Sequence, residues 1–190
     1  NYNDSYSWLY SNIRAFQVAN PRGDGEAPTL EDFHLSAVFD PLTDRPRIVI
    51  NGTATDDLAG VKGVYLRLNS PTGSNAFLDT WVYYDHSSNN KTTVHLDAYH
   101  ALTTDFHPGE YKVDYLRLTD GATNEISLNA LDINQVGFSS TVRVYFPEPD
   151  GSSGGTEVKG SAQADFVFGT NRSDDILYGN EGNDYLFSGD

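Results

Sequence analysis

Short runs of alternating hydrophobic and polar residues make up most of this chain, and helical spacing is rare. Between Thr29 and about Pro149 the runs are rich in Val, Ile, Tyr and Phe, and Gly, Pro, Asn, Asp and Ser interrupt them. This pattern is typical of an all-β sandwich, because half-buried strands alternate inward and outward side chains and each interruption supplies a turn. We expect strands at Phe33–Phe39, Pro46–Thr55, Lys62–Asn69, Phe77–Tyr84, Thr92–Ala98, Glu110–Thr119, Asn124–Leu128 and Ser140–Phe146. Leu128–Val136 has apolar residues near helical spacing and is expected to hold a helical turn.

Changes in composition divide the chain into four expected parts. Residues 1–27 contain a lead-in strand at Asn12–Val18 and a linker rich in Pro and Gly. Residues 28–148 form the sandwich, and residues 149–159 form a Gly/Ser linker. Residues 160–190 are Gly-rich, acidic and free of Pro, so we expect them to form a separate structural unit.

The last part contains an internal repeat of nine or ten residues. Its three units are Gly160–Phe168, Thr170–Tyr178 and Gly179–Phe187. Each unit has an Asp followed two residues later by Val or Leu; these aspartates are Asp165, Asp175 and Asp184. A turn followed by a three-residue strand fits this period, with one apolar residue pointing into a narrow core.

Turns of this composition suit calcium. Glycine permits left-handed dihedral angles and exposes backbone carbonyls, while Asp supplies a charged oxygen. Stacked turns would assemble such oxygens into a cage for Ca²⁺, and without the cation a column of aspartates would repel itself. Beside the three aspartates, the turn residues expected to take part are Gly160, Gly179, Asn180 and Gly182.

One unit matches a known motif closely. Gly179–Phe187 agrees with G-G-x-G-x-D-x-U-x at the first Gly, the fourth-position Gly, the Asp and the apolar position, and Asn180 replaces the second Gly. The other two units are degenerate, with Gln163 and Ser173 at the fourth position. On these residues the segment resembles the RTX family of secreted bacterial proteins, whose repeats build a calcium-loaded parallel β-roll.

The RTX resemblance implies an arrangement of ligands. In that family each calcium lies between loops two units apart, so the loop 160–165 should pair with the loop 179–184. Asp165 and Asp184 would then be the carboxylate ligands, together with turn carbonyls. Asp175 would need a fourth unit, so we expect it to be an unfilled half-site in a longer array that the chain enters but does not complete.

The sandwich has a resemblance of its own. Ala54–Val61, followed by a Tyr-rich strand, and Leu118–Asn124 look like segments of the bacterial immunoglobulin-like modules that accompany such repeats in large secreted enzymes and adhesins. The resemblance implies an immunoglobulin-like sandwich with an accessory function rather than a catalytic one.

Two acidic loops of the sandwich are candidates for a second metal site. Asp56 and Asp57 follow the second expected strand, and Asp120 and Asn124 follow the strand that contains Tyr115. In an immunoglobulin topology these loops emerge at the same end, so hard oxygen ligands would converge there. Asp-Asp and Asp-Gly sequences also make turns without a metal, and turn chemistry alone explains them.

A second candidate surface is an aromatic and cationic sheet face. The segments Val64–Leu68 and Asp114–Leu118 repeat one phrase, and strand alternation puts their Tyr and Arg side chains on the outer face. The residues of this expected ligand face are Tyr65, Arg67, Tyr115, Arg117, Trp81 and Tyr83. Such a face could stack sugar rings and pair the carboxylates of an acidic polysaccharide, although cross-strand pairs of this kind also stabilise a sheet without a ligand.

Charge and composition exclude several classes of partner and site. The chain has 27 Asp and Glu against 12 Lys and Arg, for a net charge of −15, which disfavours nucleic acid because phosphate binding needs clustered cations. It has no Cys, which removes disulfides, thiolate zinc sites and Cys nucleophiles. No apolar run reaches the roughly 18 residues that span a bilayer, and Asn1 looks like the start of a processed or excised fragment.

Catalytic motifs are also missing from the sequence. It has no Gly-x-Ser-x-Gly elbow, no phosphate-binding loop and no H-E-x-x-H helix motif. His95, Asp97 and His100 lie close together on one strand and its turn, but they are too few to complete a zinc site.

These observations favour a secreted, non-catalytic, calcium-binding accessory module of a larger bacterial RTX protein, which folds as it meets calcium outside the cell. The alternative is a carbohydrate-binding module of an adhesin or polysaccharide-degrading enzyme. A third reading is the C-terminal region of a secreted protease.

Overall fold

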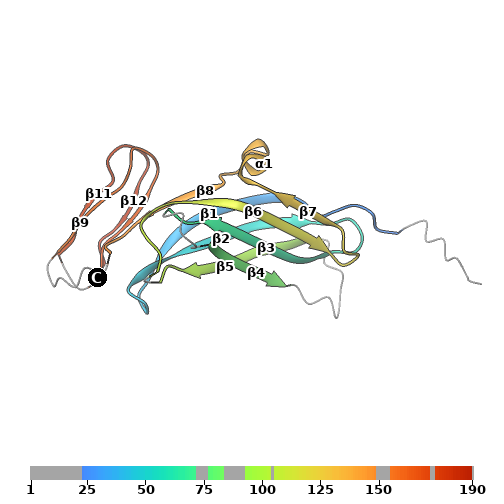
Figure 1. The fold of residues 1–190 in the computed structure, drawn as a ribbon, viewed down its shortest axis with the longest axis horizontal. Coiled ribbons are helices and arrows are strands. Elements are labelled where there is room, and N and C mark those ends of the chain that lie inside the picture. The colour runs from blue at the N-terminus through green and yellow to red at the C-terminus, as the bar shows by residue number, and fades with distance from the viewer. Residues whose placement is uncertain are drawn as a thin grey trace, which may run out of the picture.

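The computed structural model describes residues 23–71, 77–83, 93–103, 105–148, 155–171 and 174–189, and in these residues the fold is all-β with one short helix (Figure 1). The longer strands are β1 (Thr29–Asp40), β2 (Arg45–Thr55), β3 (Val61–Asn69), β4 (Phe77–Tyr83), β5 (Thr93–Ala101), β6 (Gly109–Asp120), β7 (Glu125–Leu128) and β8 (Thr141–Tyr145). The short ones are β9 (Glu157–Lys159), β10 (Phe166–Phe168), β11 (Ile176–Tyr178) and β12 (Tyr185–Phe187). The helix α1 covers Ala130–Gln135.

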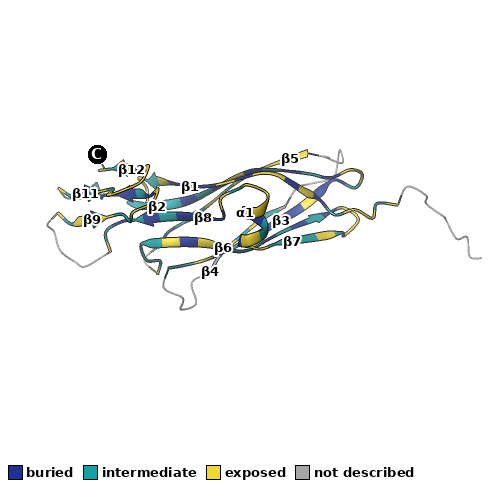
Figure 2. Cartoon of the chain, turned by 90° about the horizontal axis from the view of Figure 1, so that it is seen from above, coloured by how far each residue is buried: buried dark blue, intermediate teal, exposed yellow. Residues whose placement is uncertain are grey.

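Two sheets face each other across one hydrophobic core. The smaller sheet has the order β1-β2-β5, and the larger has the order β12-β10-β8-β6-β3-β4, with β7 paired to β6. Buried side chains from both sheets meet between them, and buried and exposed residues alternate along the strands (Figure 2). The core includes Phe33, Leu35, Ile48, Ile50, Val94, Leu96, Val64, Leu66, Leu68, Val113, Leu116, Leu118, Val142 and Val144. Each large apolar side chain that is fully buried contributes about 1.5–3 kcal/mol to stability. The alternating pattern therefore determines which face of each strand packs into the core.

The strand predictions between residues 33 and 146 are confirmed for the residues that the structure describes, and the observed strands differ from them mainly at the ends. β1 begins before Phe33 because Thr29 and Leu30 pair with the end of β2 on the far side of a β-bulge. The bulge lies between Leu30 and Asp32, so it interrupts the alternation that the prediction depended on. The expected strand Asn12–Val18 lies outside the described residues.

The helical turn expected in Leu128–Val136 is present as α1. Asn129 caps it: the side chain accepts hydrogen bonds from the backbone N–H groups of Leu131 and Asp132, and Asp132 accepts one from the Asn129 N–H. This reciprocal capping box satisfies backbone donors that a six-residue helix leaves without intrahelical partners. Ile133 anchors the helix by burying its side chain completely in the core.

The C-terminal strands continue the larger sheet instead of standing apart from it. β10 pairs in parallel with β8, where Phe166 lies opposite Val144. Phe168 is completely buried, and Phe39 of β1 stacks on Phe168 and Phe187. Hydrophobic contacts between the aromatic residues of the repeat and the two-sheet core therefore join the two parts.

The expected linker 149–159 is shorter than the sequence indicated. Its last residues form β9, which pairs in parallel with β11 in a separate two-stranded sheet. Val158, at the centre of β9, is buried like Val167 of the first unit, whereas Leu177 is half-buried and Leu186 is exposed, so the narrow core expected for the repeat is formed only by the units nearest the sheets. The repeat segment therefore begins before Gly160. Among the described residues, no helix combines the length and the apolar character that crossing a bilayer requires.

Candidate metal sites

The repeat segment places each Asp against the glycine that opens its own turn. Ser161 donates from its backbone N–H and its hydroxyl to Asp165, and Thr170 does the same to Asp175. A Cβ atom added to Gly160 would lie 2.6 Å from Asp165 Oδ2, so the carboxylate occupies the space of a side chain. The glycines of the repeat thus make room for carboxylates inside the turns.

Turns two units apart lie against each other. The backbone N–H of Asp165 donates to Asp184 Oδ1 at 3.1 Å, and the Asn180 side chain donates to the carbonyl of Gly160 at 2.7 Å. Gly182 has φ +119, and a Cβ there would be 2.6 Å from the carbonyl oxygen of Gln163. The loops 160–165 and 179–184 are therefore in direct contact, as the RTX resemblance implied.

Asp175 belongs to the other stack of turns. Its Oδ1 accepts a hydrogen bond of 2.8 Å from the N–H of Thr156, the same relation that Asp184 has to Asp165. Thr156 stands where a repeat unit would have its Asp, which explains why the sequence did not reveal this earlier unit. The predicted ligands are thus divided: Gly160, Asp165, Gly179, Asn180, Gly182 and Asp184 share one stack, and Asp175 lies in the other.

The carboxylate and carbonyl oxygens of the repeat are ligands of the kind that calcium binds. Asp165 is only 2% exposed, and a buried carboxylate needs hydrogen-bond donors or a cation around it. Each carboxylate oxygen has two lone pairs, so the hydrogen bonds described above leave capacity for a metal. Carboxylate and carbonyl oxygens are the ligands that Ca²⁺ prefers.

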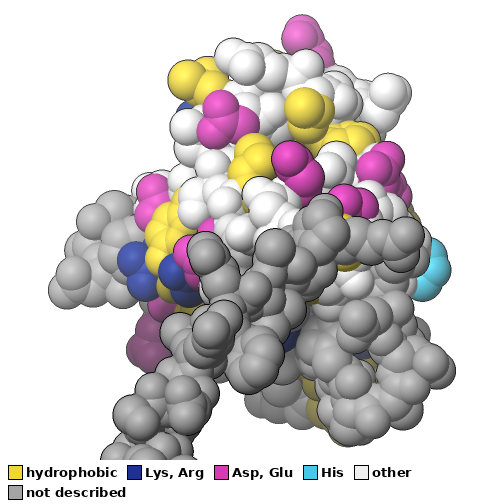
Figure 3. All heavy atoms as spheres, turned by 90° about the vertical axis from the view of Figure 1, so that its right-hand side faces the viewer, with side chains coloured by type: hydrophobic (Ala, Val, Ile, Leu, Met, Phe, Trp, Pro, Cys, Tyr) yellow, Lys and Arg dark blue, Asp and Glu magenta, His cyan; other side chains and the backbone are white. Residues whose placement is uncertain are grey.

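A second group of acids lies at the opposite end of β6 from the repeat segment. Gly109, at the start of β6, pairs with Val144 beside β10, whereas Asp120 ends the strand next to Val61. The start of β1 meets the end of β2 at the same place, because Thr29 pairs with Thr55. Loops that are distant in sequence therefore meet there, and acidic side chains gather on this end of the molecule (Figure 3).

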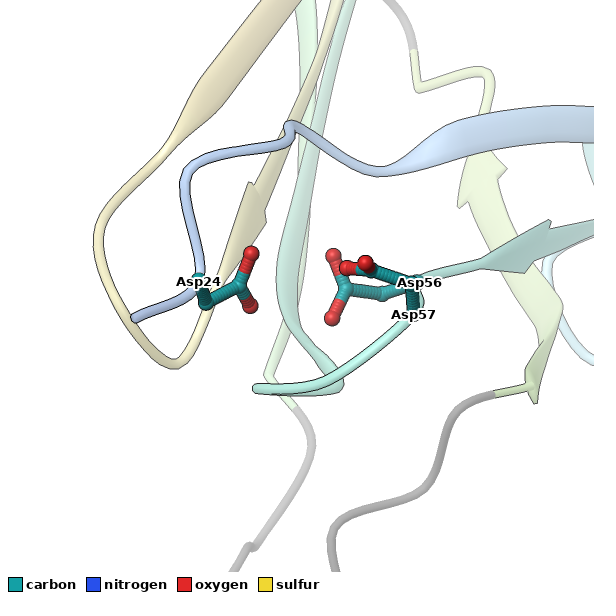
Figure 4. Close-up of side chains that lie close together, drawn as sticks. All are labelled: Asp24, Asp56 and Asp57. Atoms are coloured by element: carbon teal, nitrogen blue, oxygen red, sulfur yellow. The ribbon is translucent and has the colours of Figure 1, made fainter. Parts of the chain in front are cut away.

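Asp24, Asp56 and Asp57 converge in this group. One carboxylate oxygen of each lies within 4.8 Å of one from the other two. Figure 4 shows Asp24 facing Asp56 and Asp57 across the gap. Backbone N–H groups of the loop between β2 and β3 donate to one oxygen each of Asp24 and Asp56. Ala59 donates to Asp24 Oδ2 at 2.7 Å, and Gly60 donates to Asp56 Oδ2 at 2.6 Å.

The environment of Asp56 opposes its negative charge. Burial is the main cause that raises the pKa of this carboxyl, and the charges of Asp24 and Asp120 raise it further. Hydrogen bonds from Gly60 and Leu58 act in the other direction. Asp56 is 8% exposed, and its Oδ1 is buried without a hydrogen-bond partner.

The four residues predicted for a second metal site divide into two roles. Asp56 and Asp57 join the acidic group, whereas Asp120 is completely buried and both of its oxygens accept hydrogen bonds from Asn124. The Asn124 side chain also lies 3.4 Å from the carbonyl oxygen of Asp24, to which it donates. Asp24 is not among the predicted ligands, because it lies in a stretch rich in Pro and Gly that indicates a linker. The antiparallel pairing of the first two strands would have revealed it, since residues before one strand meet residues after the other.

The structure brings Tyr65, Arg67, Tyr115, Arg117 and Trp81 of the predicted ligand face together, and most of their contacts are with one another and with Asp79. Tyr65 lies opposite Arg117, and Arg67 opposite Tyr115, on the paired strands β3 and β6. Tyr65 is only 4% exposed. Asp79 accepts hydrogen bonds from both the Tyr65 hydroxyl and the Arg67 guanidinium.

Trp81 completes this face. Its ring packs on Tyr65, the Arg117 guanidinium lies over it, and 49% of the residue stays exposed. The side chain of Tyr83 is outside the described residues. Carbohydrate binding by this face stays a prediction, because the contacts present are those that stabilise a sheet without a ligand.

A search of family models, curated proteins and solved structures found no match to this chain, so the case for its function depends on its own residues.

Proposed function

We propose that this chain is a non-catalytic, calcium-binding accessory module of a larger secreted bacterial protein of the RTX type. In this proposal the two packed sheets are an immunoglobulin-like β-sandwich, and the repeat segment is the beginning of a parallel β-roll. The strand orders β1-β2-β5 and β4-β3-β6-β8 support the first part, because an immunoglobulin-like sandwich divides its strands in this way.

The observation that best supports calcium binding is the stacking of turns two units apart. β10 pairs in parallel with β12, and β9 pairs in parallel with β11. An Asp precedes three of these four strands at the same position, so the parallel pairing brings Asp165 and Asp184 to the same edge. Carboxylates in register at one edge repel each other unless a cation lies between them.

In the proposed mechanism the residues of the chain position oxygens, and the cation neutralises them. Bound Ca²⁺ would supply positive charge to the oxygens of Asp165 and Asp184 and to nearby turn carbonyls. The glycines allow the turns to approach each other, and Phe168 attaches the first turns to the sandwich core. Since binding selects the folded turns, calcium shifts the equilibrium of the repeat towards the folded state, and a chain that leaves a calcium-poor cytosol folds outside.

Thermal unfolding of the 190-residue chain in chelator and in millimolar calcium tests the proposal. We expect calcium to raise the unfolding midpoint and the β-strand signal in circular dichroism, and we expect the double variant Asp165→Asn, Asp184→Asn to lose most of this gain. Asp97→Asn is the matched control, because it removes one charge from an exposed position on β5. Equal calcium responses in the double variant and the wild type would contradict the proposal.

A further inference from the structure

The acidic group at the loop end of the sandwich has a feature that turn formation does not explain. Asp56 Oδ2 accepts the two backbone hydrogen bonds that shape the loop, from Leu58 and Gly60. Asp56 Oδ1 takes no part in that turn, and it is buried without any donor. The side chain points towards the carboxylates of Asp24 and Asp57 (Figure 4).

No cationic side chain compensates this group within the described part of the chain. None of the ion pairs among the described residues includes Asp24, Asp56 or Asp57. Asp120 adds a further negative charge behind Asp56, and Asn124 uses its amide on Asp120 and on the Asp24 carbonyl. Buried charged groups in proteins are paired or coordinate metals, so an anionic oxygen in this place calls for a positive partner.

We infer that Asp24, Asp56 and Asp57 form a calcium site in the sandwich, separate from the repeat segment. The three residues supply hard carboxylate oxygens, and the buried Asp56 Oδ1 is the central ligand. Oxygens bound to one Ca²⁺ at 2.3–2.6 Å lie no more than about 5 Å apart, and the spacing in this group is within that limit. Mg²⁺ binds at shorter distances, usually keeps several waters and takes only one or two carboxylates, so a group of three carboxylates favours Ca²⁺.

The site would fasten the segment before β1 to the loop between β2 and β3. Asp24 belongs to the first, and Asp56 and Asp57 belong to the second. In the structure these parts already share the hydrogen bond from Ala59 to Asp24. A bound cation would add a charged link at the same point, and so fix the path by which the chain enters the sandwich.

Amide NMR spectra of the full chain, recorded during calcium titration near neutral pH, test this inference locally. The background is the double variant Asp165→Asn, Asp184→Asn, so that the repeat segment does not dominate the response. We expect millimolar calcium to shift the amide signals of Leu58, Ala59 and Gly60. Their N–H groups donate to the carboxylates of Asp24 and Asp56.

Adding Asp56→Asn should abolish these shifts, and Asp24→Asn is a second variant that keeps an oxygen for the Ala59 hydrogen bond. Adding Asp97→Asn instead should leave the shifts intact. The inference is overturned if the three amides do not respond to calcium, if they respond equally in Asp56→Asn, or if magnesium at the same concentration has the same effect. The repeat variants in the background make this outcome independent of whether the repeat itself binds calcium.

Discussion

The two acidic regions of this chain place their Asp side chains in different environments. In the repeat segment, Asp165, Asp175 and Asp184 all accept hydrogen bonds from turn residues, and neighbouring turns add further donors. At the loop end of the two packed sheets, Asp56 keeps one buried oxygen without a donor. The first arrangement arises from a period of nine or ten residues, whereas the second requires two segments, one before β1 and one between β2 and β3, to meet after the sheets have formed. A local repeat is visible in the sequence, and a convergence of distant loops is not.

The largest expected effect is at the junction of the two regions. Phe168→Ala removes a completely buried ring that contacts Phe39, Phe187 and Tyr185, and we expect a loss of about 3–5 kcal/mol in the free energy of unfolding. Urea unfolding measures this loss. The milder Phe168→Leu should lose less, because it keeps most of the apolar volume. A loss below about 1 kcal/mol for Phe168→Ala would show that the repeat does not depend on the two-sheet core.

Much of the fold could be predicted because it follows from local alternation. Leu66 and Leu68 alternate with Tyr65 and Arg67, and this pattern predicts the strand and the face that carries the two leucines into the core. Pairing between β8 and β10 could not be predicted, since two short strands that are distant in sequence leave no local sign of their contact. Thr156 illustrates a related limit. It occupies the position of the repeat Asp in an earlier unit of the structure, but its side chain does not match the motif, so the sequence does not reveal that unit.

A smaller loss of stability is expected from glycine substitutions, and two of them distinguish backbone strain from a steric clash in the repeat. Gly182→Ala combines a positive φ with a clash against Gln163, whereas Gly137→Ala has φ +94 and open space around its Cβ. We expect Gly182→Ala to lower the stability of the repeat by about 1–3 kcal/mol, and by more than Gly137→Ala lowers the stability of the two-sheet core. Hydrogen exchange of the amides in β10 and β12 measures the first effect. Equal losses would mean that the stacked turns are loosely packed.

The smallest effects concern pH, and they compare a carboxylate that has a cation with one that lacks it. The Arg67 guanidinium lowers the pKa of Asp79, so the stability from this pair is present above the unfolded value of 3.8 and is lost as the pH falls through the lower folded value. The pKa of Asp56 is raised, so in chelator its charge destabilises the fold as the pH rises through that value.

At neutral pH in chelator, Asp56→Asn should therefore raise the unfolding midpoint, whereas Asp79→Asn should lower it slightly. Thermal unfolding between acidic and neutral pH measures both. Changes of the same sign in the two variants would contradict this contrast.

The most direct test of the account is the number of calcium ions that the 190-residue chain binds, measured by equilibrium dialysis at millimolar calcium. We expect the double variant Asp165→Asn, Asp184→Asn to bind fewer ions than the wild type, and Asp56→Asn to remove one more independently. A wild-type chain that binds no calcium under these conditions, or variants that bind as much as the wild type, would contradict it.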